Sequence, residues 1–118
     1  MSAETRTGGC HCGAVRFEAV VDLDQTIQCN CSICAKAGFI WSFIPASRFT
    51  LQAEGRTTEY LFHKHAVHHR FCDVCGIEAF AQGEHPDGSG MMVAVNVRCL
   101  DDIDLAALKP QSVDGRSL

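Results

Sequence analysis

Hydrophobic and polar residues alternate along several short stretches of the chain with a period of two. Val15, Phe17 and Ala19 alternate with polar neighbours, and residues 93–98 repeat the pattern with three valines. Because successive side chains of a strand point to opposite faces, this period is typical of half-buried β strands. Both stretches are therefore predicted to be strands with one face in the core.

Other stretches have no clear period, but their composition also favours strands. Two β-rich stretches flank a C-x-x-C pair, which predicts a strand–turn–strand unit. Helix is expected only as one turn at Ser32–Ala37 and as a short segment from Asp101 or Asp102 to Leu108. The further predicted strands are Phe39–Ile44, Thr57–Phe62, Val67–Phe71 and Glu78–Ala81. The prediction is a mainly β fold with short helical turns only, in which the turns carry the functional residues.

The length and the charge narrow the class of protein. The chain has 118 residues, which is the size of one domain. Its net charge is -4, with 10 basic and 14 acidic side chains, so no nucleic-acid partner is expected. The first nine residues are polar, and the longest apolar runs are far too short to cross a bilayer. We expect a cytoplasmic protein with no membrane contact and a flexible N-terminus at residues 1–7.

Eight cysteines change this picture, because they fall into three clusters and one single position. In a reducing cytoplasm, this number points to metal or redox chemistry and not to disulfides. Cysteines separated by only one or two residues are well placed to chelate one ion. The clusters are Cys10 with Cys12, then Cys29, Cys31 and Cys34, then Cys72 with Cys75, and Cys99 stands alone.

The first and third clusters together supply four thiolates, the number that a structural zinc site requires. Gly13 and Gly76 directly follow the last cysteine of each pair. Glycine at these positions allows a positive φ, which turns backbone N–H groups toward sulfur. An ion shared by the two clusters would join distant chain segments. The sequence therefore predicts a closed zinc site that stabilises a small β domain.

The middle cluster supplies three thiolates, which leaves one position of a tetrahedral zinc ion open, as in catalytic sites. Alternatively, Cys99 or a histidine completes the site, or the three cysteines are buried without a metal. Iron–sulfur ligation fits the spacing less well. Three thiolates make the zinc ion a weak Lewis acid. Such a site is better suited to holding an incoming thiol as thiolate than to activating water.

Three motifs occur in the order and spacing of a known family. They are Gly9-Cys10-His11-Cys12-Gly13, Cys29-x-Cys31-x-x-Cys34 and Phe71-Cys72-x-x-Cys75-Gly76. Over about residues 8–116, the chain resembles the glutathione-dependent formaldehyde-activating enzyme (GFA) and centromere protein V domain family. Residues 36–40, 45–51 and 95–101 look closest to the centromere protein V-like branch. Ala35 departs from many members, which have a basic residue directly after the third cysteine of the middle motif.

This resemblance implies the Mss4-like fold, a β-rich zinc-bound scaffold, for a single domain at residues 8–116. It implies a structural zinc ion on the first and third clusters and a catalytic zinc ion on the middle cluster. The founding activity of the family is a carbon–sulfur lyase reaction, the reversible addition of glutathione to formaldehyde. The cofactors that it implies are two zinc ions, with glutathione as co-substrate and a small aldehyde as its partner.

Five residues outside the clusters are candidates for the reaction or for substrate binding. His65 and His69 match histidine positions of the resembling branch. Either is a candidate acid–base group or fourth ligand, or else a solvated histidine. Lys36, Trp41 and Arg98 are candidates for contacts with glutathione. The simpler interpretations of these three are a solvated lysine, a core aromatic residue and the solvent side of a strand.

Three functions compete on these observations. The first is a zinc-dependent carbon–sulfur lyase acting on glutathione adducts of formaldehyde or a similar small aldehyde. The second is a non-enzymatic, zinc-stabilised module that binds glutathione or a protein. The third is a redox enzyme like the B-type methionine sulfoxide reductases. This third function does not explain the three cysteines of the middle cluster. By alternation, Cys99 lies on the same face of its predicted strand as the valines, and it is expected to be a buried, inert thiol.

Overall fold

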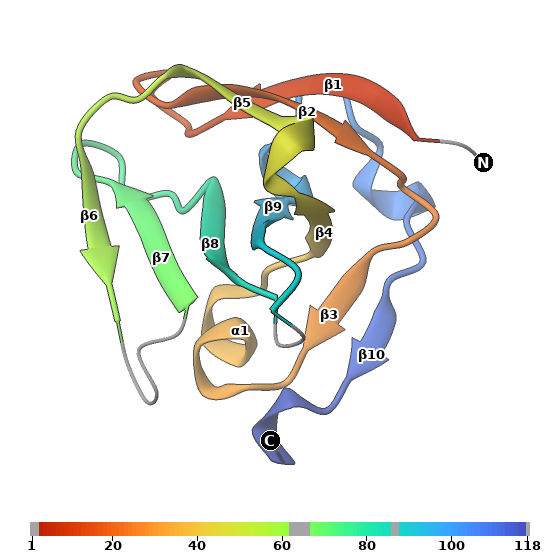
Figure 1. The fold of residues 1–118 in the computed structure, drawn as a ribbon. Helices are drawn as coiled ribbons and strands as arrows, with labels where there is room; N and C mark the ends of the chain where they lie inside the picture. The colour runs from red at the N-terminus through yellow and green to blue at the C-terminus, as the bar shows by residue number, and fades with distance from the viewer. Residues whose placement is uncertain (1–2, 62–66, 86–87, 118) are drawn as a thin grey trace.

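Two β sheets pack against each other in the computed structural model, which describes residues 3–61, 67–85 and 88–117 (Figure 1). The smaller sheet crosses the top of the view in Figure 1 and has three antiparallel strands in the order β1-β2-β5. Its strands are β1 (Glu4–Gly9), β2 (Arg16–Val21) and β5 (Phe49–Ala53).

The larger sheet has seven strands in the order β10-β3-β4-β9-β8-β7-β6. All of its neighbouring strands are antiparallel except β10 and β3, which are parallel. In that order, the strands are Gln111–Val113, Ile27–Cys29, Trp41–Pro45, Met91–Asn96, Phe80–Glu84, Val67–Cys72 and Thr57–Tyr60. Helical structure is limited to α1 (Ser32–Ala37) and the 3-10 turns η1 (Ala46–Arg48), η2 (Val97–Cys99), η3 (Leu105–Ala107) and η4 (Gly115–Ser117).

The main core fills the space between the two sheets. Phe17 on β2 is fully buried, and its ring lies 5.3 Å from that of Phe49, which lies 4.9 Å from that of Phe80 on the larger sheet. This chain of aromatic contacts crosses from one sheet to the other. Val93 and Val95 on β9 complete the same cluster. Burial of these large apolar side chains is the main term that holds the sheets together.

A second apolar cluster lies on the opposite face of the larger sheet. Trp41, Ala81 and Ala94 alternate with residues of the main core and therefore point away from it. They pack against Phe39 and against the cysteines of the middle cluster, which α1 and the end of β3 carry. The middle cluster is thus part of a small core of its own.

The predicted fold class is confirmed, since the chain is mainly β with short helical turns only. The strand–turn–strand unit around the C-x-x-C pair is present as β7 and β8, and the predicted helical turn at Ser32–Ala37 is α1. Helix α1 ends at Gly38, whose φ of 73° suits glycine. Among the residues that the structure describes, no helix is long and apolar enough to span a membrane.

The flexible N-terminus predicted for residues 1–7 is wrong from Glu4 onward. Residues from Glu4 to Gly9 pair with β2 along its whole length. The hydroxyl of Thr7 also donates to Asp101 Oδ2 at 2.8 Å, which ties the strand to a distant loop. The residues before Gly8 are polar because they are exposed or only partly buried, and the pairing of the strand with β2 supplies the order that composition did not indicate.

Two further expectations need correction. The stretch 93–98 is not half-buried: β9 ends at Asn96, and residues 93–96 are buried on both faces because a separate apolar cluster covers each face. The helix expected up to Leu108 is reduced to one 3-10 turn, η3, whose start is capped by the Asp104 carboxylate.

Candidate functional site: two cysteine clusters

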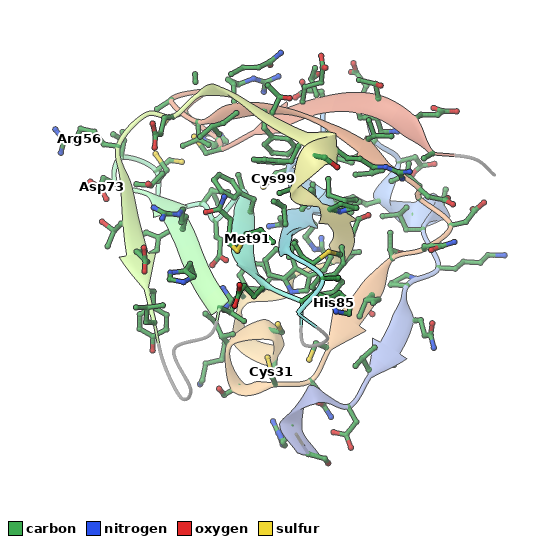
Figure 2. All side chains as sticks on the ribbon, in the orientation of Figure 1. Cys31, Arg56, Asp73, His85, Met91 and Cys99 are labelled. Carbon is green, nitrogen blue, oxygen red and sulfur yellow. The ribbon has the colours of Figure 1, made fainter. Side chains whose placement is uncertain are left out.

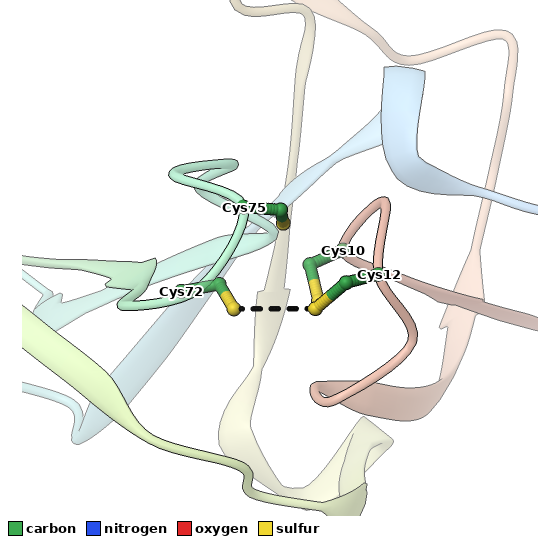
Figure 3. Close-up of side chains that lie close together, drawn as sticks. All are labelled: Cys10, Cys12, Cys72 and Cys75. Atoms are coloured by element: carbon green, nitrogen blue, oxygen red, sulfur yellow. Dashed lines mark hydrogen bonds between the residues drawn. The ribbon is translucent and has the colours of Figure 1, made fainter.

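The first and third cysteine pairs come together as one four-sulfur cluster (Figure 3). Cys10 and Cys12 lie on the turn between β1 and β2, while Cys72 ends β7 and Cys75 lies on the following turn. All four Sγ atoms lie within 4.8 Å of one another. The Cys10–Cys12 and Cys12–Cys72 sulfur pairs are each 3.6 Å apart.

These distances fit zinc. A tetrahedral ion with Zn–S bonds of about 2.3 Å requires neighbouring sulfurs to be about 3.8 Å apart. Two turns supply the geometry, because Gly13 and Gly76 adopt φ values of 84° and 78°. The predicted positive φ at both glycines is therefore confirmed.

Backbone N–H groups surround the four sulfurs. The amide of Val15 donates to Cys10 Sγ at 3.3 Å, and the amide of Val74 donates to Cys72 Sγ at 3.4 Å. Amide donation from Cys12 and Ile77 lowers the pKa of the Cys75 thiol to about 6. The turns are thus arranged to stabilise negative charge on sulfur, which is the form that binds a metal ion.

The end of β3 and the first turn of α1 bring together the three sulfurs of the middle cluster. Cys29 ends β3, Cys31 directly precedes α1, and Cys34 lies within α1. Their Sγ atoms also lie within 4.8 Å of one another. Among residues 3–61, 67–85 and 88–117, no histidine, carboxylate or other cysteine joins this group. A donor set of three thiolates suits zinc and leaves one tetrahedral position for another ligand.

Cys99 does not complete the middle cluster, so that alternative is wrong. Figure 2 shows Cys99 in the upper half of the molecule, well away from Cys31 beside α1. The Cys99 thiol donates to the carbonyl oxygen of Glu78 at 3.8 Å. Burial raises its pKa to about 12, so the thiol is uncharged at neutral pH. Cys99 is half-buried, and it lines a cleft between the two clusters.

Trp41 makes a contact that the sequence did not indicate. Its indole Nε1–H donates to Cys34 Sγ at 3.3 Å, and only 3% of the residue is exposed. Burial raises the pKa of the Cys34 thiol to about 12, and the indole hydrogen bond acts in the opposite direction. Trp41 is therefore a core residue, and its hydrogen bond also favours the thiolate form of Cys34.

We predict that Trp41→Phe weakens metal retention at the middle cluster. The substitution keeps an aromatic side chain but removes the N–H donor, and a hydrogen bond to a charged group contributes about 1.5 kcal/mol or more. Release of one of two bound zinc ions to a chromogenic chelator should become about tenfold more favourable. Release of the other ion should not change. An equal change at both sites would contradict the assignment and indicate general loosening of the fold.

The C-terminal segment covers one side of the middle cluster. Strand β10 lies parallel to β3, and the side chain of Asn30 donates to Asp114 and accepts from the amide of Arg116, both at 2.9 Å. Between them, Gly115 lies so close that an added Cβ atom would be 2.3 Å from Cys29 Sγ. The sequence holds no local signal for this contact, because Gly115 and Cys29 are far apart in the chain.

Gly115→Val is expected to displace Cys29 and to reduce zinc retention at the middle cluster by tenfold or more. No backbone strain is involved, since the φ of Gly115 lies outside the left-handed region. The effect therefore reports on the contact alone, which is far inside the separation of about 3.5 Å for touching atoms. Gln111→Ala, an exposed change on β10, is the matched control. Retention equal to that of the control would show that the segment does not position Cys29.

His69 is buried and paired. Its Nδ1 lies 2.7 Å from Glu78 Oε2, and 5% of the residue is exposed. Its ring stacks on Phe39 at 6.3 Å between centroids, and lies 6.5 Å from Trp41. His69 therefore lies close to the apolar core around the middle cluster, but it does not belong to the group of three sulfurs. The sequence did not single out Glu78, because a lone acidic residue after a C-x-x-C turn has no distinguishing pattern.

The remaining candidates lie in different surroundings. Lys36 is exposed in the last turn of α1. Arg98 is also exposed, and its Nε donates to the carbonyl oxygen of Gly38 at 2.8 Å. It lies in η2 and not on a strand as predicted. His65, the other candidate histidine, lies outside the described residues.

Comparison with known proteins places this geometry in context. A family model described as glutathione-dependent formaldehyde-activating enzyme matches residues 5–114. The chain is also similar to a crystal structure of a Rhodobacter sphaeroides protein from a structural genomics programme. That similarity has a TM-score of 0.78 and 27% sequence identity, and covers 90% of this chain and 97% of the other.

Proposed function

This chain belongs to the glutathione-dependent formaldehyde-activating enzyme family, and from that premise we propose that it is a zinc-dependent carbon–sulfur lyase. Its proposed substrates are glutathione, or a related small thiol, and formaldehyde or a similar small aldehyde. The proposed cofactors are one structural zinc ion and one catalytic zinc ion. The observation that carries the proposal is the middle group of three sulfurs, which no other described side chain completes.

The finer placement in the centromere protein V-like branch also remains a proposal, supported by the resemblance of residues 36–40, 45–51 and 95–101. The site of action that we propose is the cytoplasm. Seven ligating thiols must stay reduced, and the cytoplasm is the compartment that keeps them so.

The three middle cysteines and His69 have different roles in the proposed reaction. Cys29, Cys31 and Cys34 would hold the ion, and the backbone amide of Cys31 donates to Cys29 Sγ at 3.5 Å. When bound there, zinc would supply a position that favours the thiolate form of an incoming thiol. In the addition, the carbon–sulfur bond forms, the carbonyl π bond breaks, and the thiol proton ends on the former carbonyl oxygen. His69 is too deeply buried to be proposed as a direct proton donor, so we assign it a positioning role through Phe39 and Glu78.

The test is an exchange NMR measurement. Zinc-loaded protein is mixed with glutathione and formaldehyde, and the rate of adduct formation and breakdown is compared with the spontaneous rate. We expect acceleration that is lost in Cys31→Ser, which removes one of the three middle sulfurs. An unchanged rate would rule out this activity. Tight thiol binding without turnover would instead support the non-enzymatic binding module.

A further inference from the structure

A cleft of about 550 Å³ lies between the two cysteine clusters. Its walls come from the turn of the first cysteine pair, from α1, and from the segment that follows the C-x-x-C turn. A cavity of this size is within the range that holds a small organic molecule. No residue of either metal cluster lines this cleft, so a molecule in it would lie beside the metal ligands and not replace them.

Glu78 supplies a buried carboxylate to this cleft. Only 9% of the residue is exposed, and Oε2 is engaged by His69 at 2.7 Å. Oε1 has no partner within the part of the chain that the structure describes. Burial raises the pKa of this carboxyl, although the contact with His69 lowers it. A ligand that brings a positive charge or N–H donors to Oε1 would offset the cost of keeping the carboxylate charged.

Arg98 supplies a positive charge to the same cleft. Its Nε donates to Gly38, and within the described ranges it forms no ion pair with a carboxylate. The side chain of Asn96 connects the backbone of Arg98 to the backbone of Glu78. The Asn96 side chain donates to the carbonyl oxygen of Glu78 at 2.9 Å and accepts from the amide of Arg98 at 3.2 Å. One buried amide side chain thus links the backbones of Glu78 and Arg98, and both residues line the cleft.

The cleft lies within reach of the middle cluster. Ile33 and Ala37 line it from α1, the same helix that carries Cys34. A helix of this length spans about 9 Å, and an extended tripeptide spans about 10 Å. Because Ile33 is next to Cys34 in the chain and lines the cleft, a small peptide thiol with one end in the cleft lies beside the three cysteines.

We propose that this cleft binds the zwitterionic amino-acid end of the thiol substrate. Glu78 Oε1 accepts hydrogen bonds from the free α-amino group, and Arg98 pairs with the α-carboxylate on the same carbon. The inference rests on the proposed function, since it names the part of the substrate that the site recognises. It makes Glu78 and Arg98 specificity-determining residues that select thiols with a free amino-acid group remote from the sulfur.

The first test changes the ligand and leaves the protein intact. Calorimetry with the zinc-loaded full chain compares S-methylglutathione with its des-amino analogue, in which a glutaryl group replaces the γ-glutamyl group. Both probes lack a thiol, so their binding does not depend on sulfur coordination. We expect S-methylglutathione to bind about tenfold or more tightly than the analogue, as a charge-assisted hydrogen bond requires. Equal affinity, or no binding of either probe, would overturn the proposal.

The second test uses Glu78→Gln, with Glu84→Gln as the matched control. Glu84 is exposed at the end of β8 and does not line the cleft. The Glu78 variant should lose the preference for the free amino group, while the control should keep it. Arg98→Gln should weaken binding of both probes about tenfold, because both retain a carboxylate at that end of the molecule. If the Glu78 variant does not fold, the comparison of the two ligands on the unmodified protein still tests whether the cleft recognises the free amino group.

The outcomes separate this inference from the proposed function. Acceleration of adduct formation without a preference for the free amino group would retain the lyase and overturn the role of the cleft. A preference for the free amino group without acceleration of adduct formation would support the role of the cleft and contradict the lyase activity.

Discussion

Cys72→Ser is expected to abolish the folded state, with the largest effect of any single substitution in the chain. Cys72 is 1% exposed, and its sulfur meets that of Cys12 from a turn sixty residues away. Metal binding at such sites contributes about 10–16 kcal/mol, whereas a whole domain is stable by only about 5–15 kcal/mol. The loss of one ligand should therefore remove most of the stability. Circular dichroism and zinc content per chain measure it.

Cys99→Ser is the matched control for this prediction. It removes the cysteine that belongs to neither cluster. The variant should remain folded, with two zinc ions per chain. A Cys72→Ser protein that unfolds cooperatively near the temperature of this control would contradict the role of the four-sulfur cluster as the main cross-link between the two halves of the chain.

Cys31→Ser should reduce the zinc content from two ions per chain to one and abolish the proposed activity. The fold should survive, because this cluster joins β3 only to the adjacent α1 and lies outside the main core. Serine is a poor zinc ligand, and two remaining thiolates hold the ion weakly. Zinc analysis, thermal unfolding and exchange NMR on one preparation report the three effects separately.

Two other results would change the interpretation of the middle cluster. Unfolding of Cys31→Ser would show that the cluster is structural and not catalytic. Full activity with one zinc ion per chain would show that the ion bound there takes no part in the reaction. Gly115→Val should give an intermediate effect, since it displaces one ligand without removing it.

Much of the candidate site could be predicted because its ligands are close together in the chain. Two cysteines separated by one or two residues on a turn point to the same place in nearly any fold, so the spacing of Cys29, Cys31 and Cys34 already indicated a shared ion. The pairing of the other two clusters followed from the number of ligands that zinc requires. The structure places the sulfurs in these two groups.

The surroundings of the ligands could not be predicted in the same way. The contacts of Trp41 with Cys34, of Gly115 with Cys29 and of Glu78 with His69 depend on how distant or alternating strands are arranged. Nothing in the local sequence records these distances. The same reason explains the error at the N-terminus, where polar residues form an ordered strand because β2 pairs with them.

The sequence by itself therefore determined the fold class, the family and the two groups of cysteines that could hold a metal ion, because alternation of side chains and short cysteine spacings act over a few residues. The tertiary structure alone decided which side chains surround each cluster. It buried Trp41 against Cys34, excluded Cys99 from the middle cluster, and placed Glu78 and Arg98 in one cleft. These arrangements depend on strand order, which brings together residues that are separated by tens of positions in the chain.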